Sequence, residues 1–183
     1  PERDWMSLVE SSYAVLEESS QLSRVGLPSD WVLLDTQTGD YYSVPATSDL
    51  ETLYGFDAYR VWWRVALDAA WFDSPEASRF LEEHLFNLQQ RWREEQYIPA
   101  QINLQGQPLV DYDSTSQYAM LYAALREVDP AMAQEIQEQK LLPTYSNGFW
   151  DNNSAYYVQN LAWFGLVSPT TINPNLLIAD ERL

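Results

Sequence analysis

The chain has 183 residues, and 27 Asp and Glu against 10 Lys and Arg give it a formal net charge of −17. So acidic a chain is not expected to bind nucleic acid or an anionic membrane, because both need clustered Lys and Arg. Hydrophobic residues make up 46% of the chain, which predicts a packed core and excludes a disordered acidic tail. The chain has no cysteine and one histidine, His84, which excludes disulfides, thiolate metal sites and sites built from several histidines.

Helical periodicity dominates the sequence. Apolar residues recur every three or four positions over residues 3–18, which predicts a first amphipathic helix. Residues 24–53 contain many turn-forming residues and are expected to form one long loop, of a length that usually serves a function. A second helix is predicted over residues 54–72. The remaining predicted helices cover residues 75–92, which follow a Ser-Pro start, residues 114–128, a short stretch from residue 130, and residues 154–165.

These elements predict an all-α fold. Strand patterns are weak, and residues 31–35 and 98–109 suit short hairpins at most. Six helices joined by alternating long and short loops predict three antiparallel helical hairpins, which form an arc rather than a closed globule. Aromatic residues at helical spacing, such as Trp5 and Trp92, are expected in the core. His84 lies in a polar stretch and is expected at the solvated surface. The longest apolar run is interrupted by charges, so no membrane span is predicted.

The second predicted helix carries a stripe of charges on an otherwise apolar rod. Asp57, Arg60, Arg64 and Asp68 are spaced so that they share one face. Charges in such a setting must be paired or must face a wet cavity. Two interpretations stay open at this point. Asp57 and Arg60 form a structural ion pair at the helix start, where the dipole favours a carboxylate, or Asp57 is a general base that Arg60 orients.

Three segments, in the same order, resemble glycoside hydrolase family 8. Residues 54–64, Tyr-Gly-Phe-Asp-Ala-Tyr-Arg-Val-Trp-Trp-Arg, are similar to the family segment Tyr-Gly-x-Asp-Ala-x-Arg-x-Pro-Trp-Arg, with Trp62 in place of Pro. Residues 26–31, Gly-Leu-Pro-Ser-Asp-Trp, resemble its Gly-Leu-x-Pro-Asp-Trp loop, with Pro one place early. Tyr156 and Tyr157 resemble the double tyrosine that starts the last helix of the family barrel.

The resemblance implies a fold and a reaction. Family 8 comprises inverting endo-β-1,4-glucanases and their relatives, built as an (α/α)6 barrel of helical hairpins. Residues 1–183 would then be the C-terminal half of a single catalytic domain, with about three of the six hairpins. Asp57 matches the proton acceptor that activates water, Arg60 would hold it oriented and ionised, and the general acid, a Glu, would lie on a missing N-terminal half. The residues expected to line sugar subsites are Tyr54, Trp31, Tyr156 and Tyr157.

The same resemblance implies partners and location. We expect a β-glucan polysaccharide or oligosaccharide, the N-terminal half of the same enzyme and the cellulose-synthase machinery as partners, with no cofactor and no metal. A secreted, periplasmic or cell-envelope location in a bacterium is expected. Two other hypotheses stay open. The chain is a non-catalytic carbohydrate-binding or scaffolding half-toroid, or it is a helical protein-interaction module that binds no sugar.

Overall fold

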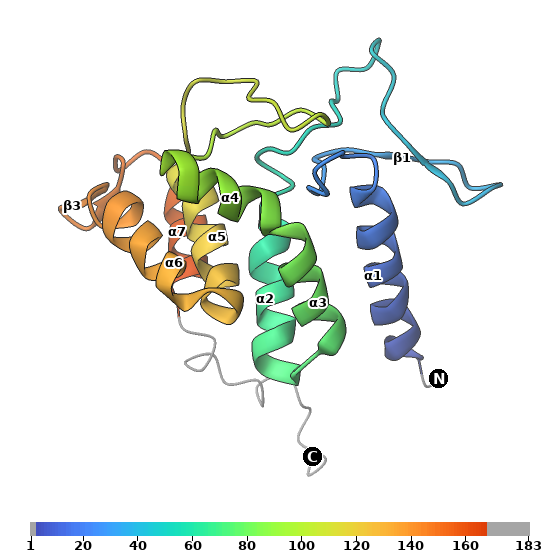
Figure 1. The fold of residues 1–183 in the computed structure, drawn as a ribbon, viewed down its shortest axis with the longest axis horizontal. Coiled ribbons are helices and arrows are strands. Elements are labelled where there is room, and N and C mark those ends of the chain that lie inside the picture. Colours follow the sequence, from blue (N-terminus) through green and yellow to red (C-terminus); the bar gives the residue numbers. More distant parts are fainter. Residues whose placement is uncertain (1–2, 168–183) are drawn as a thin grey trace.

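The computed structural model describes residues 3–167, which are largely helical (Figure 1). This confirms the predicted all-α fold. The α-helices are α1 (Trp5–Ser20), α2 (Arg60–Phe72), α3 (Pro75–His84), α4 (Phe86–Glu95), α5 (Thr115–Val128), α6 (Pro130–Ile136) and α7 (Tyr156–Leu166), and the π-helix η1 (Gln137–Leu141) continues α6. Two antiparallel hairpins pair β1 (Leu33–Leu34) with β2 (Tyr41–Tyr42) and β3 (Tyr145–Ser146) with β4 (Phe149–Trp150). No helix between residues 3 and 167 has both the length and the apolar character needed to cross a membrane.

Helices α3 and α6 begin where the sequence predicts, each at a capping residue followed by proline. The side chain of Ser74 accepts a hydrogen bond from the backbone N–H of Ala77 at 3.2 Å. In the same way, Asp129 accepts from the N–H of Met132 at 3.2 Å. Each cap satisfies one of the N–H groups that the first helical turn leaves without a partner.

Helix α5 lies at the centre of the bundle, in contact with α2, α3, α6 and α7. All of its residues from Thr115 to Leu121 are buried. The largest core side chains beside it include Trp62 on α2 and Trp92 on α4, both at most 1% exposed. Packing on several sides therefore holds α5 in place.

Helix α1 lies to one side of this bundle (Figure 1), where it contacts α2. A groove of about 460 Å³ runs between the two helices, lined by Leu8 and Val15 of α1 and by Val61 of α2. The hydroxyl of Tyr13 donates a hydrogen bond across this interface to Asp68 at 2.6 Å. Trp5 is 61% exposed, so the prediction that it lies in the core is wrong, because Trp5 is the first residue of a helix at the edge of the bundle.

Two predicted helix boundaries are wrong. The second helix begins at Arg60 rather than at Tyr54, because Tyr54 pairs with Ile102 in an isolated antiparallel bridge and residues 56–59 form a turn. The helix predicted over residues 75–92 is interrupted at Leu85, which separates α3 from α4. Leu85 keeps helical dihedral angles (φ −78°, ψ −15°), so the interruption is a bend and not a loop.

The β3–β4 hairpin is absent from the sequence-based predictions. Asn147 and Gly148 form its turn, both with positive φ (52° and 88°), which matches the Asn-Gly preference of two-residue hairpins. Its strands have only two residues each, too few to produce an alternating pattern. The strand β1 lies within the predicted residues 31–35. Residues 98–109 form no named strand, but they fold back on themselves through an antiparallel bridge between Ile102 and Pro108.

Candidate active site

Asp57 lies on the turn at residues 56–59, immediately before helix α2. Arg60 contacts it twice: Nη2 donates to the carboxylate Oδ1, and Nε donates to the Asp57 backbone carbonyl at 3.3 Å. The side chain of Asp57 is 40% exposed and that of Arg60 is 33% exposed, so this ion pair lies at the surface of the described bundle. The geometry is compatible with both interpretations of the pair, structural and catalytic.

The backbone of this turn is held by Asp30, which lies 27 residues earlier in the chain. Its Oδ1 accepts hydrogen bonds from the N–H of Asp57 at 3.0 Å and from the N–H of Ala58 at 2.7 Å. The N–H of Asp30 itself donates to the carbonyl of Leu53 at 2.7 Å. Burial raises the pKa of the Asp30 carboxyl, although the backbone N–H groups act in the opposite direction. A β-carbon on Gly55 would lie 2.6 Å from Asp30 Oδ2, so the approach requires glycine.

Tyr157, in the first turn of α7, contacts the same turn from another side. Its hydroxyl donates a hydrogen bond to the carbonyl oxygen of Phe56. Burial raises the pKa of Tyr157, and the negative charges of Asp57 and Asp30 act in the same direction, whereas Arg60 lowers it. The structure therefore brings three of the predicted site residues, Asp57, Arg60 and Tyr157, together.

The N-terminal ends of α2, α5 and α7 meet at this point. The hydroxyl of Tyr59 lies 2.7 Å from Ser116 Oγ, which in turn lies 2.7 Å from Ser114 Oγ at the start of α5. Thr115 donates to Asp151, in the loop before α7, at 2.8 Å. The dipoles of helix N-termini stabilise negative charge, so this end of the bundle suits a carboxylate that works in its ionised form.

Three of the four aromatic residues predicted to bind sugar are accessible to solvent. Trp31 is 46% exposed, Tyr156 is 80% exposed and Tyr157 is 38% exposed. Trp31 directly follows Asp30, and the two tyrosines begin α7, so all three lie on segments that border the Asp57 turn.

Tyr54, the fourth, lies in the core. It is 2% exposed, and its hydroxyl accepts hydrogen bonds from Trp62 Nε1 at 3.0 Å and from Gln117 Nε2 at 3.4 Å. Its ring is therefore not accessible to a ligand in this structure. Tyr54 instead packs α2 against α5 beneath the turn that carries Asp57.

Asp30 is the main residue of this site that sequence reasoning missed. Aspartate is a common helix cap, but the turn that Asp30 serves lies 27 residues away, beyond the reach of any local capping pattern. The sequence signal for Asp30 is its place in the Gly-Leu-Pro-Ser-Asp-Trp segment, in which the resemblance implies a site role for Trp31 alone. Tyr59 was likewise missed, because its contact with Ser116 joins residues 57 positions apart.

His84 is the last residue of α3 and lies against α1 and the loop at Gly26, so the expectation of a solvated surface residue is wrong. It is 8% exposed, and its ring stacks on Phe80 with the centroids 4.2 Å apart. Nδ1 lies 2.5 Å from the carbonyl oxygen of Gly26, and Nε2 lies 3.0 Å from Glu17 Oε2. Because a carbonyl oxygen only accepts hydrogen bonds, Nδ1 is the donor toward Gly26. The polar neighbours of His84 in the sequence concealed contacts that come from two distant segments.

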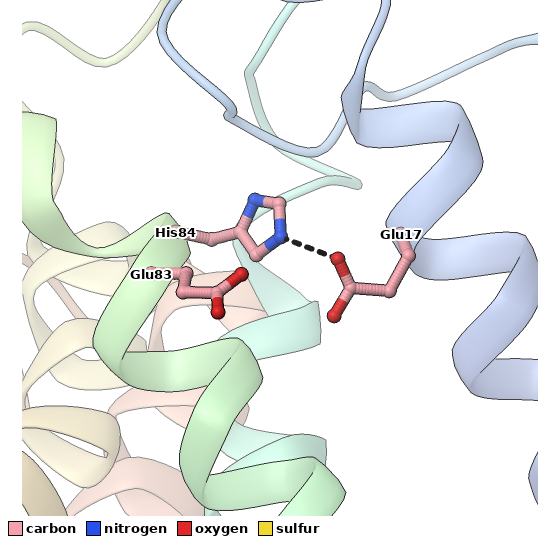
Figure 2. A group of neighbouring side chains, drawn as sticks. All are labelled: Glu17, Glu83 and His84. Carbon is pink, nitrogen blue, oxygen red and sulfur yellow. Dashed lines mark hydrogen bonds and ion pairs between the residues drawn. The ribbon is translucent and has the colours of Figure 1, made fainter.

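Glu83 lies beside this pair (Figure 2). One ligand atom from each of Glu17, Glu83 and His84 falls within 4.8 Å of the other two, and this mixture of oxygen and nitrogen donors could hold a divalent cation. In the structure, His84 and Glu17 bind each other directly. The cluster thus links α1 to α3 through its own side chains.

Two solved structures have a similar fold. An endo-1,4-D-glucanase from Vibrio fischeri ES114 aligns with a TM-score of 0.67 and 21% sequence identity, over 91% of this chain and 44% of that protein. A beta-1,3-1,4-glucanase from Paenibacillus sp. X4 aligns with a TM-score of 0.67 and 16% identity, over 88% of this chain and 42% of that protein. This chain therefore spans less than half the length of either structure, and its helices match part of an (α/α)6 toroid, as predicted.

No curated protein matches this chain in sequence. The sequence profile of the glycosyl hydrolases family 8, in contrast, matches residues 2–171. That match includes all three segments on which the resemblance was based, the loop at residues 26–31, the turn and helix at 54–64, and the start of α7. The chain belongs to glycosyl hydrolase family 8.

Proposed function

We propose that this protein is an endo-acting glycoside hydrolase that cleaves a β-1,4-glucan with inversion, and that Asp57 is its general base. The observation that carries the proposal is the position of Asp57, a partly exposed carboxylate paired with Arg60 where the N-termini of three helices meet. Family membership supports glycoside hydrolysis as the reaction class, and the two glucanase structures support a glucan as the substrate.

The proposed reaction needs two carboxyl groups in different protonation states. An inverting hydrolase uses a carboxylate to take a proton from the attacking water, while a protonated carboxyl on the opposite side donates a proton to the leaving oxygen. Asp57 suits the first task because Arg60 holds Oδ1 and the exposed part of the side chain leaves room for water. The two carboxyls of such enzymes stand about 6.5–9.5 Å apart, so we place the acid, a Glu, across from Asp57 on the N-terminal half.

The exposed aromatic residues are proposed to bind the glucan. Sugar rings present flat patches of C–H groups that stack on aromatic faces, and their hydroxyls bond to tyrosine oxygens. Trp31, Tyr156 and Tyr157 have the exposure that such contacts require. Tyr54 is proposed to act indirectly, by supporting the Asp57 turn from the core.

The remaining hairpins of the barrel are proposed to come from the N-terminal half of the same enzyme. This proposal is supported by the coverage of the matched structures, of which this chain spans 44% and 42%. It is also supported by exposed apolar side chains on α1, such as Trp5 and Met6, which a neighbouring hairpin would cover. Bacterial export and cooperation with a cellulose-synthase complex extend the proposal and rest on the family resemblance.

The experiment that tests the function is Asp57→Asn in the full-length protein that contains this chain. We expect turnover of cello-oligosaccharides to be abolished and their binding, measured by calorimetry, to be retained. NMR of the first product of the unmodified enzyme should show the inverted α-anomer. Asp68→Asn is the matched control, because it makes the same charge change on α2 and leaves an oxygen to accept from Tyr13. Near-normal turnover by Asp57→Asn would rule out this base. Binding without any turnover by the unmodified protein would instead favour a non-catalytic half-toroid.

A further inference from the structure

We infer that Asp30 is a positioning residue for the proposed base, and that its carboxyl sets the direction in which the Asp57 side chain points. The inference rests on the proposed function of Asp57. Its basis is the pair of hydrogen bonds that Asp30 Oδ1 accepts from the N–H groups of Asp57 and Ala58.

These two bonds hold the two peptide planes that flank the α-carbon of Asp57. The N–H of Asp57 belongs to the plane before this carbon, and the N–H of Ala58 belongs to the plane after it. A single oxygen at 3.0 Å and 2.7 Å from the two nitrogens therefore restricts both φ and ψ of Asp57. Once these angles are restricted, the direction of the Cα–Cβ bond is set as well.

The carbonyl groups of the same two peptide planes also accept hydrogen bonds. The Phe56 carbonyl, in the first plane, accepts from the hydroxyl of Tyr157, and the Asp57 carbonyl, in the second, accepts from Arg60 Nε. Each plane is thus held at its N–H end by Asp30 and at its C=O end by a residue of the proposed site. Among the residues that the structure describes, Asp30 is the one side chain that acts on both planes through their N–H groups.

Asp30 is itself held firmly enough to do this. Its N–H donates to the carbonyl of Leu53, and its Oδ2 lies against Gly55, where a β-carbon would approach within 2.6 Å. The loop at residues 26–31 and the segment at residues 53–58 therefore interlock. This explains why two motifs of the sequence, far apart in the chain, meet at one point.

A purely structural cap would make a different prediction. A residue that only stabilises the start of α2 would lower the free energy of unfolding when removed, but would leave kcat unchanged in protein that stays folded. A positioning residue would lower kcat much more than it changes KM, because Asp30 bonds to the backbone of the Asp57 turn and not to the side chains of the aromatic residues that are proposed to bind sugar. Misplacing a reacting group by about 1 Å costs on the order of 100-fold in rate.

The test compares Asp30→Ala, Asp30→Asn and the control Asp35→Ala in the full-length enzyme. Asparagine keeps an oxygen that accepts both N–H groups, whereas alanine removes it. Asp35 makes a comparable pair of bonds, accepting from the N–H groups of Gln37 and Thr38 at 2.8 Å and 3.4 Å, but within its own exposed turn. We measure kcat and KM on cello-oligosaccharides, together with amide hydrogen exchange of residues 56–59.

For Asp30→Ala we expect kcat to fall by about 100-fold with KM changed by less than about threefold, and faster exchange in residues 56–59. Asp30→Asn should recover most of both losses, and Asp35→Ala should show neither. An Asp30→Ala enzyme with normal kcat would overturn the inference, as would an Asp30→Asn enzyme that keeps slow exchange but loses activity like alanine. If Asp57→Asn itself retained turnover, the proposed function would fail instead, and the exchange result would still report whether Asp30 holds the turn.

Discussion

Gly165 of helix α7 lies against the backbone of Ala119 in helix α5, so close that a β-carbon on Gly165 would stand 2.1 Å from the Ala119 carbonyl oxygen. No flexible side chain is available to move away, because the obstacle is a helix backbone at the centre of the core. The start of α7, which carries Tyr156 and Tyr157, therefore depends on a glycine at the other end of the same helix.

This contact predicts that Gly165→Ala destabilises the protein by about 3 kcal/mol, the upper end of the usual cost of overpacking. Gly39→Ala is the control, because Gly39 has a positive φ of 84° and nothing within 4 Å of the added carbon. It should cost only the backbone strain, about 1–2 kcal/mol. Urea denaturation of both variants checks the prediction, which fails if Gly165→Ala is the milder change.

The contacts of His84 lead to a second prediction about stability. It joins three segments, because one nitrogen donates to Gly26, the other contacts Glu17, and the ring stacks on Phe80. Replacing it by alanine leaves the Gly26 carbonyl without its partner, and we expect a loss of about 2 kcal/mol in the free energy of unfolding. His84→Asn, which can still donate toward Gly26, should recover part of that loss.

Hydrogen exchange identifies which of the His84 contacts matters. In His84→Ala we expect α1 to exchange faster, since Glu17 is its polar link to α3. Glu17→Gln keeps an oxygen at this position and should change α1 much less. If the protection of α1 against exchange were unchanged in His84→Ala, the contacts between α1 and α2 would be sufficient to hold α1 without the histidine.

Replacing Arg60 is expected to lower turnover, because both the shape and the charge of its guanidinium group matter for its contacts with Asp57. Its guanidinium reaches both the carboxylate and the backbone carbonyl of Asp57, a pair of contacts that a lysine ammonium cannot reproduce. In the full-length enzyme we expect kcat to fall about tenfold for Arg60→Lys and about 100-fold for Arg60→Ala. Arg79→Lys, at an exposed position of α3, serves as the control. If Arg60→Ala left kcat unchanged, the ion pair between Arg60 and Asp57 would have a structural role and no role in turnover.

Local chemistry explains which parts of the fold the sequence predicts well. Ser74 and Asp129 each act on an N–H group three residues away, so their caps are visible as short patterns followed by proline. The same reasoning overextends α2 toward Tyr54, because nothing local marks the bridge to Ile102 that keeps this segment out of the helix. A helix boundary is therefore predicted correctly when the contact that sets it joins residues close together in the sequence.

The candidate site follows the same rule. Asp57 and Arg60 are three positions apart, and their pairing is predicted from spacing alone. Tyr157 is separated from Phe56 by 101 positions, and the sequence brings it to the site only through the family resemblance. Tyr54 shows the limit of that resemblance, since a residue inside a shared motif can serve the core instead of the ligand.

A pH dependence of stability is expected from the half-buried carboxyl of Asp30. Burial raises its pKa above the ordinary value of 3.8, so the folded chain holds this proton more tightly than the unfolded chain does. Above 3.8 and below the raised value, the unfolded state has lost the proton and the folded state has kept it, so the free energy of unfolding falls as the pH rises. The contribution is fully present below 3.8 and is lost as the pH passes through the raised value.

Denaturation of the wild type and of Asp30→Asn between about pH 3 and pH 7 isolates this contribution, because the variant has no ionisable group at that position. We expect the wild type to be most stable relative to the variant at the acidic end and to lose that advantage toward neutral pH. The charge of Asp57 is one of the causes that raise the pKa of Asp30. The same comparison in an Asp57→Asn background should therefore move the change to lower pH. A difference that stays constant with pH would mean that Asp30 titrates alike in the folded and unfolded chains.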